Sequence, residues 1–67
     1  MPLRWEDAED VAERLAEAHA GVDPLTVRFT DLRHWVCALP EFGDDPKAST
    51  EGDLERIQMA WVEQRES

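Results

Sequence analysis

Carboxylates are the most abundant side chains in this sequence that could do chemistry. The 67 residues include 16 acidic side chains against seven lysines and arginines, which gives a formal charge of −9. Carboxylate oxygens can hold hard metal cations, and a strongly negative body attracts basic protein surfaces. An acidic helix face can also be an ordinary solvated face, so both interpretations stay open at this point.

Many of the acidic residues gather in two places. Four recur at helical spacing and would form a carboxylate ridge along one helix face: Glu6, Asp10, Glu13 and Glu17. Three more stand in a later loop: Glu41, Asp44 and Asp45. Arg14 offers Asp10 a partner four residues away. Because such a surface repels phosphates and anionic lipids, we expect neither nucleic acid nor membrane as a partner.

The single cysteine and the two histidines are the other candidates for chemistry. His34 stands one turn before Cys37, a spacing that could activate a thiol, and a partly buried, inert thiol is the alternative. His19 and His34 show no metal-ligand spacing, so we expect surface or boundary positions for both. Since no set of nucleophile, base and pocket can be recognised, we do not expect an enzyme.

The number of cysteines and the hydropathy of the sequence indicate the cellular compartment. One cysteine cannot form an internal disulfide or a multi-cysteine zinc site, which favours a reducing compartment. The N-terminus lacks an apolar signal region, and no stretch approaches the ~20 apolar residues that span a bilayer. We therefore expect a soluble, cytoplasmic protein. As a separate expectation, the protein would be a monomer.

The elements that position these groups are organised around residues 26–37. The first part of this stretch is β-branched and aromatic and predicts a brief extended segment, after a turn at Asp23-Pro24. Thr30 is placed to cap the helix that follows. Four apolar residues then recur at helical spacing and should face the core: Leu32, Trp35, Val36 and Leu39.

A first helix is expected from about Ala8 to Ala20. Asp7 should cap it, and Gly21 is well placed to end it. Its buried stripe consists mostly of small side chains, which let a neighbouring helix approach closely: Ala8, Val11, Ala12, Leu15 and Ala18.

The last helix should open at Ser49 or Thr50, with Asp53 completing a capping box with Thr50. Its buried side should comprise Leu54, Ile57 and Trp61, with Val62 at the margin. We expect residues 63–67 to fray.

Two arginines and three tryptophans have structural interpretations. Arg28 and Arg33 flank the central turn and are expected to pair with Asp23 or Asp31, with contact to acids of a partner as the alternative. The tryptophans are expected to anchor the core: Trp5, Trp35 and Trp61.

The linker from Pro40 to Ala48 should be anchored by Phe42 while its acids face water, and Pro40 should end the central helix near Leu39. Together these patterns predict one small all-α domain over residues 1–67. It would be a three-helix, winged-helix-like or helix-turn-helix domain with at most a very short extended segment.

Several short motifs follow one another along the whole chain. They are Leu3-x-Trp5, Asp23-Pro24-x-Thr26-Val27-Arg28-Phe29-Thr30-Asp31, Trp35-x-Cys37-x-Leu39, Phe42-x-Asp44-Asp45-Pro46, Ala48-Ser49 and Trp61. In this order and register, the chain resembles the IscX family of bacterial iron–sulfur cluster assembly proteins.

The resemblance implies a small, winged-helix-like adaptor that binds cysteine desulfurase and weakly binds Fe²⁺ or Fe³⁺ through surface carboxylates. Such a protein would be an iron donor or a modulator of the desulfurase, with a role and an acidity like those of frataxin. The acids that match the family pattern are Asp7, Asp23, Asp31, Asp44 and Asp45. The chain departs from that pattern at Pro40 and Gly43, where the family often has further acids.

Two overlapping sets of carboxylates are the predicted sites. The candidate iron ligands are Asp7, Asp10, Glu13, Glu17, Asp31, Asp44 and Asp45. The predicted partner surface comprises Glu6, Asp10, Glu13, Glu17, Glu41, Asp44 and Asp45. A DNA-binding helix-turn-helix regulator is the alternative function, suggested by architecture alone.

Overall fold

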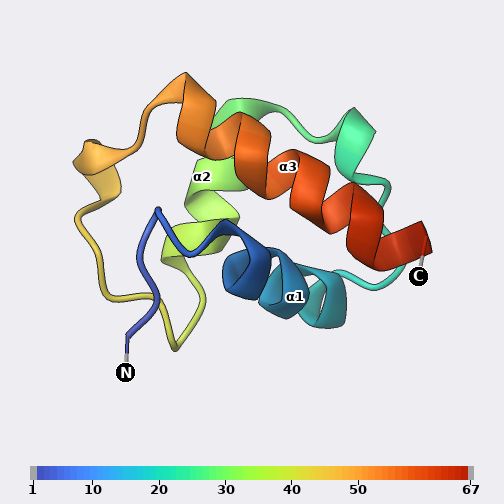
Figure 1. Ribbon diagram of the computed structural model, residues 1–67, viewed down its shortest axis with the longest axis horizontal. Coiled ribbons are helices and arrows are strands. Elements are labelled where there is room, and N and C mark those ends of the chain that lie inside the picture. The colour runs from blue at the N-terminus through green and yellow to red at the C-terminus, as the bar shows by residue number, and fades with distance from the viewer. Residues whose placement is uncertain (1, 67) are drawn as a thin grey trace.

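A computed structural model describes residues 2–66, which form three α-helices joined by turns (Figure 1). The helices are α1 (Ala8–Ala18), α2 (Phe29–Cys37) and α3 (Glu51–Glu66), with 3₁₀ turns η1 (Pro24–Thr26) and η2 (Pro46–Ala48). The described residues contain no β-strand, although Leu3 and Phe42 form an isolated parallel β-bridge. The predicted all-α class is confirmed. The wing of a winged-helix domain is a β-hairpin, and residues 2–66 contain none.

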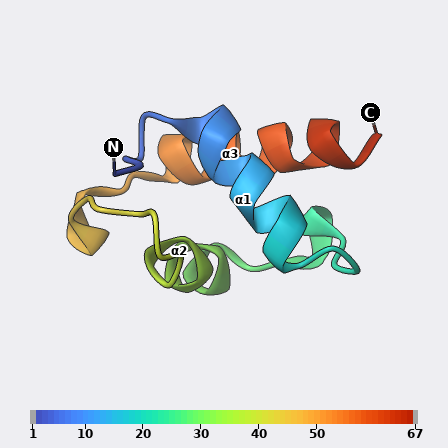
Figure 2. The same cartoon turned by 90° about the horizontal axis from the view of Figure 1, so that it is seen from below.

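The helices enclose a single core. The longest helix, α3, packs against α1 and contacts α2, and α2 is seen nearly end-on in Figure 2. Each helix contributes an apolar stripe, and Trp5 joins from the N-terminal segment. The buried apolar residues are Trp5, Val11, Ala12, Leu15, Leu32, Val36, Leu39, Leu54, Ile57, Ala60 and Trp61. Small residues on α1 and α3, such as Ala12 and Ala60, let these two helices approach closely.

Helix α1 is shorter than predicted, because it ends at Ala18 rather than Ala20. His19 follows as the C-cap, and its backbone N–H donates to the carbonyl of Leu15 at 2.8 Å. Gly21 does not end the helix, and its backbone is not left-handed. The prediction that Ala18 lies on the buried stripe was wrong: Ala18 is exposed, and the half-buried Ala16 packs against the core instead.

The start of α2 differs from the prediction that Thr30 caps it. The helix begins at Phe29 with Arg28 as its N-cap, so Thr30 lies within the first turn. The segment before α2 also differs from the predicted extended chain, because residues 24–26 form a 3₁₀ turn. Asp23 caps η1 by accepting a hydrogen bond from the backbone of Leu25 at 3.0 Å. Thr26 is therefore part of η1, and the extended segment is reduced to residues 27–28.

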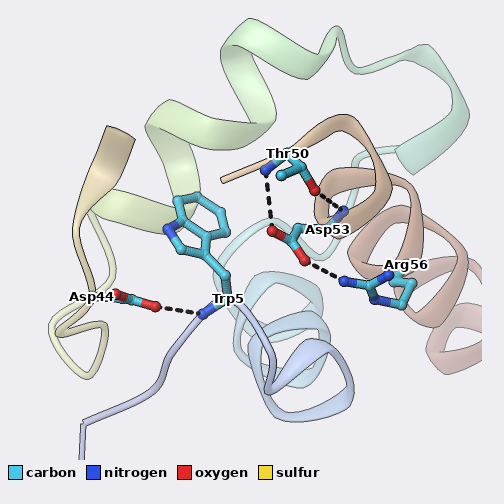
Figure 3. Close-up of polar contacts among 5 residues, drawn as sticks. All are labelled: Trp5, Asp44, Thr50, Asp53 and Arg56. Atoms are coloured by element: carbon cyan, nitrogen blue, oxygen red, sulfur yellow. Dashed lines mark hydrogen bonds and ion pairs between the residues drawn. The ribbon is translucent and has the colours of Figure 1, made fainter. Parts of the chain in front are cut away.

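Helix α3 opens with the predicted capping box (Figure 3). The backbone N–H of Asp53 donates to Thr50 Oγ1 at 3.2 Å, and the backbone N–H of Thr50 donates to Asp53 Oδ2 at 3.1 Å. The prediction of a frayed tail was wrong for residues 63–66, which are helical. Arg65 Nη1 lies 3.3 Å from Asp23 Oδ1, which ties the last turn to the start of η1. Ser67 lies outside the described residues.

Thr50→Ala should lower the free energy of unfolding by about 1 kcal/mol, because the N–H of Asp53 loses its side-chain acceptor in the first turn of α3. Urea unfolding followed by circular dichroism measures this change. Thr50→Ser keeps the hydroxyl and serves as the control. Equal losses in the two variants would show that the cap hydrogen bond is not what stabilises the helix start.

Candidate functional site

The acidic side chains lie at the surface. All 16 acids fall within residues 2–66, and none of them is buried. Thirteen are exposed, and Asp7, Asp44 and Asp53 are half-buried. Three arginines pair with acids in the described chain, namely Arg14, Arg56 and Arg65. The excess of negative charge is therefore presented to solvent.

The predicted ridge runs along α1, with Asp10, Glu13 and Glu17 exposed on the helix and Glu6 exposed in the turn before it. The helix spaces Asp10, Glu13 and Glu17 about one turn apart along its surface. We refer to these four residues as the α1 ridge.

Arg14 does not make the predicted pair with Asp10. Its Nη1 lies 3.7 Å from Glu13 Oε1 and 3.8 Å from Glu17 Oε2. Its Nε lies 3.8 Å from Glu41 Oε2. All four side chains are 42 to 67% exposed, so water screens these long contacts and leaves them weak. The arginine nevertheless brings the loop acid Glu41 beside the α1 ridge.

The loop acids Asp44 and Asp45 do more than face water, which corrects the prediction for this linker. Asp44 is half-buried; its Oδ2 accepts from the backbone N–H of Trp5 at 3.2 Å (Figure 3), and its Oδ1 accepts from the backbone N–H of Asp45 at 2.8 Å. Asp45 Oδ1 caps η2 through the backbone N–H of Lys47 at 2.9 Å. The indole N–H of Trp5 donates to the Asp45 carbonyl at 2.7 Å. These contacts fasten the loop to the N-terminal segment.

Phe42 anchors the same loop, as predicted. It is half-buried against the core, and its ring meets the Trp5 ring edge-on with 4.8 Å between centroids. Two backbone hydrogen bonds hold the loop and the N-terminal segment side by side. The N–H of Leu3 donates to the carbonyl of Glu41 at 2.7 Å, and the N–H of Gly43 donates to the carbonyl of Leu3 at 2.9 Å.

Asp7 and Asp31, the remaining candidate iron ligands, lie on different elements. Asp7 occupies the N-cap position of α1, but its side chain accepts from the backbone N–H of Arg4 at 3.0 Å instead of capping the helix. Asp31 is exposed in the first turn of α2. Within residues 2–66, no three His, Cys, Asp or Glu side chains are grouped closely enough to hold a metal ion. Iron binding by these carboxylates stays a prediction.

Cys37 is half-buried at the end of α2. Burial raises the pKa of its thiol above the ordinary value of 9.0, and the nearby positive charge of Arg33 opposes that shift. A raised pKa lowers the fraction of thiolate at neutral pH, which is the reactive form. The structure therefore favours the inert thiol over the activated one.

Alkylation of Cys37 by iodoacetamide should be several-fold slower in the folded protein than in urea. Because the folded thiol keeps its proton to a higher pH, the pH profile of the rate should shift upward relative to that of the unfolded chain. Mass spectrometry over a pH series gives both profiles. A folded profile displaced to lower pH would instead identify an activated cysteine.

The histidines and tryptophans occupy structural positions. His34 is exposed and His19 is half-buried, which agrees with the predicted surface and boundary positions. His19 stacks on Trp35, with 4.2 Å between ring centroids and 12° between planes, a contact that could not be predicted from residue spacing. Trp5 and Trp61 are buried and Trp35 is half-buried, so the tryptophans anchor the core as predicted.

The predicted pairing of Arg28 and Arg33 with Asp23 or Asp31 is not formed. Among the described residues, Asp23 pairs with Arg65, and neither Arg28 nor Arg33 takes part in an ion pair. The distant Arg65 could not be matched to Asp23 from sequence, because helix α3 brings them together only in the folded chain.

The family of the chain follows from comparison with known proteins. A sequence model described as iron-sulphur cluster assembly matches residues 3–66, which is nearly the whole chain. The chain belongs to this iron–sulfur cluster assembly family. It is also similar to the uncharacterized protein PA3808 of Pseudomonas aeruginosa, with 52% identity over 66 residues, covering 98% of this chain and all of that protein.

In this member of the iron–sulfur cluster assembly family, most of the acids that match the IscX pattern accept hydrogen bonds from the backbone. Asp7, Asp23, Asp44 and Asp45 each accept at least one backbone hydrogen bond, whereas Asp31 accepts none from the described chain. Four of the five therefore stabilise turns and loop contacts. The carboxylates of the α1 ridge accept no such backbone hydrogen bond in the described chain. Residue types alone could not separate the acids that accept backbone hydrogen bonds from those that do not.

None of the helices in the described part of this family member is long and apolar enough to cross a bilayer. The cytoplasmic location stays a prediction.

Proposed function

We propose that this chain is an acidic adaptor of iron–sulfur cluster assembly that docks through the α1 ridge on a basic surface of cysteine desulfurase. By docking, it adjusts the supply of sulfur, either as a modulator of the desulfurase or as an iron donor. It acts by binding and not by catalysis.

The observation that carries this proposal is the exposure of the carboxylates of the α1 ridge. Asp10, Glu13 and Glu17 are exposed on a helix whose opposite side is packed into the core, and the weak contacts of Arg14 with Glu13 and Glu17 leave their carboxylates accessible. Because α1 already fixes the backbone of these residues, docking has to order only their side chains. A body of formal charge −9 also accelerates encounter with a basic surface.

Iron would be weakly held cargo. Exposed carboxylate oxygens are hard ligands that suit Fe³⁺ or partly hydrated Fe²⁺. Because no three His, Cys, Asp or Glu side chains of residues 2–66 are grouped closely enough to hold a metal ion, one or two of these carboxylates together with water would hold the iron. Equilibrium dialysis against Fe²⁺ in the absence of oxygen should detect weakly bound, exchangeable iron. If the protein retains no iron, the proposal that it carries iron is contradicted.

The DNA-binding alternative gains no support. On α2, Asp31 accompanies Arg33 and His34 among the exposed residues, and family membership points to cluster assembly.

The experiment that tests docking is a pull-down of purified cysteine desulfurase from the same organism, with and without Fe²⁺. The tagged chain should retain the desulfurase in both conditions, and a change in the retained amount with iron would show that cargo and docking are coupled. Failure to retain the desulfurase in either condition would contradict the proposal.

A further inference from the structure

A groove between α1 and α3 lies beside the α1 ridge and belongs to neither set of predicted site residues. Its volume is about 500 Å³. Its apolar part is made by Ala8, Met59 and Ala60, and three carboxylates border it, those of Glu9, Glu55 and Glu63. The groove exists because Ala8, Ala60 and Gly52 are small, so the packed helices leave space above them.

Met59 is the unusual side chain in this groove. It is 54% exposed, and among large apolar side chains in residues 2–66 only Leu25 is also exposed, at 64%. Met59 lies off the buried stripe of α3, so the core does not require an apolar residue there. A flexible thioether can adapt its shape to an incoming side chain. Methionine is common on surfaces that bind varied protein segments, and here it lies in an apolar hollow bordered by charges.

The charges around the groove indicate what would bind there. Arg56 is the one basic residue in its lining, and its guanidinium donates to the carboxylate of Asp53. Glu9, Glu55 and Glu63 have no basic partner in the described chain. An acidic or phosphate-bearing ligand would be repelled, and so would a second copy of this chain with charge −9. A segment with lysines or arginines on both sides of an aliphatic side chain fits both the charge and the apolar surface.

We propose that this groove receives an aliphatic side chain from a basic segment of cysteine desulfurase, while lysines or arginines beside it meet Glu9, Glu55 and Glu63. This inference rests on the proposed function and adds a second contact to it. Glu9 lies one turn before Glu13 on α1, so the groove and the α1 ridge form one continuous surface. The ridge would supply long-range attraction, and the groove would supply an apolar anchor that slows dissociation.

The test compares the affinity of purified desulfurase for the wild type, Met59→Ser and Leu25→Ser by isothermal titration calorimetry. Both variants remove an exposed apolar side chain without changing the charge, and only Met59 lies in the groove. Met59→Ser should weaken binding about tenfold, as the loss of a buried anchor does. Leu25→Ser should change it less than twofold. A loss for Met59→Ser no larger than that for Leu25→Ser would overturn the groove inference.

A second pair of variants tests the border charges. Glu55→Gln with Glu63→Gln should weaken binding more than Glu51→Gln with Glu66→Gln, which removes the same charge from α3 outside the groove. Equal effects of the two pairs would overturn the charge match. If the wild type and the groove variants bind the desulfurase equally well, only the groove inference is contradicted. If the wild type does not bind, the proposed function fails.

Discussion

Trp61→Ala is expected to lower the free energy of unfolding by about 3–5 kcal/mol, the usual cost of replacing a buried tryptophan. The side chain is 0% exposed, and its ring lies 6.3 Å, centroid to centroid, from both His19 and Trp35. Truncation would leave a cavity where all three helices meet. Because a chain of this size has a total stability of roughly 3–10 kcal/mol, much of the population could unfold at room temperature.

Urea unfolding followed by circular dichroism measures this loss. Met59→Ala is the matched control, since it also truncates an apolar side chain of α3 but at an exposed position. Its effect should stay within about 0.5 kcal/mol. Similar losses in the two variants would contradict the assignment of Trp61 as the centre of the core.

The second large effect is expected on the α1 ridge. Reversing Asp10, Glu13 and Glu17 together to lysine should weaken binding to cysteine desulfurase by about 100-fold, because each reversal removes an attraction of ~0.2–1 kcal/mol and adds a comparable repulsion. Each reversal changes the charge by two, so the formal charge falls in magnitude from −9 to about −3. The circular dichroism spectrum should be unchanged, since all three side chains are exposed. Calorimetric titration gives the affinities.

A matched pair separates the position of the charges from their number. Glu13→Lys with Glu17→Lys alters the α1 ridge, whereas Glu51→Lys with Glu66→Lys makes the same change at the two ends of α3. The first pair should weaken binding clearly more than the second. If the pairs are equivalent, net charge alone drives the association, and α1 is not the docking surface.

Features set by local sequence could be predicted. The capping box of Thr50 and Asp53 is a contact over three residues, and the buried stripe of α3 follows from helical spacing alone. The exposure of the α1 ridge follows in the same way. These features depend on the helix to which they belong and on little else.

Features set by contacts between distant segments could not be predicted. Asp44 looked like a free loop acid because its partner, the backbone of Trp5, is 39 residues away. The last turn of α3 was expected to fray because the pairing of Arg65 with Asp23 is visible only in the folded chain. The groove beside Met59 also depends on how α1 meets α3, although an apolar residue off the buried stripe was a signal in the sequence.

The most direct test of the central claim, that an outward-facing negative surface is what the assembly machinery recognises, is a titration of the wild-type chain against cysteine desulfurase at several salt concentrations. Screening weakens contacts between exposed charges, so the affinity should fall steeply as ionic strength rises from low to about 0.5 M. An affinity that does not change over this range would contradict the account.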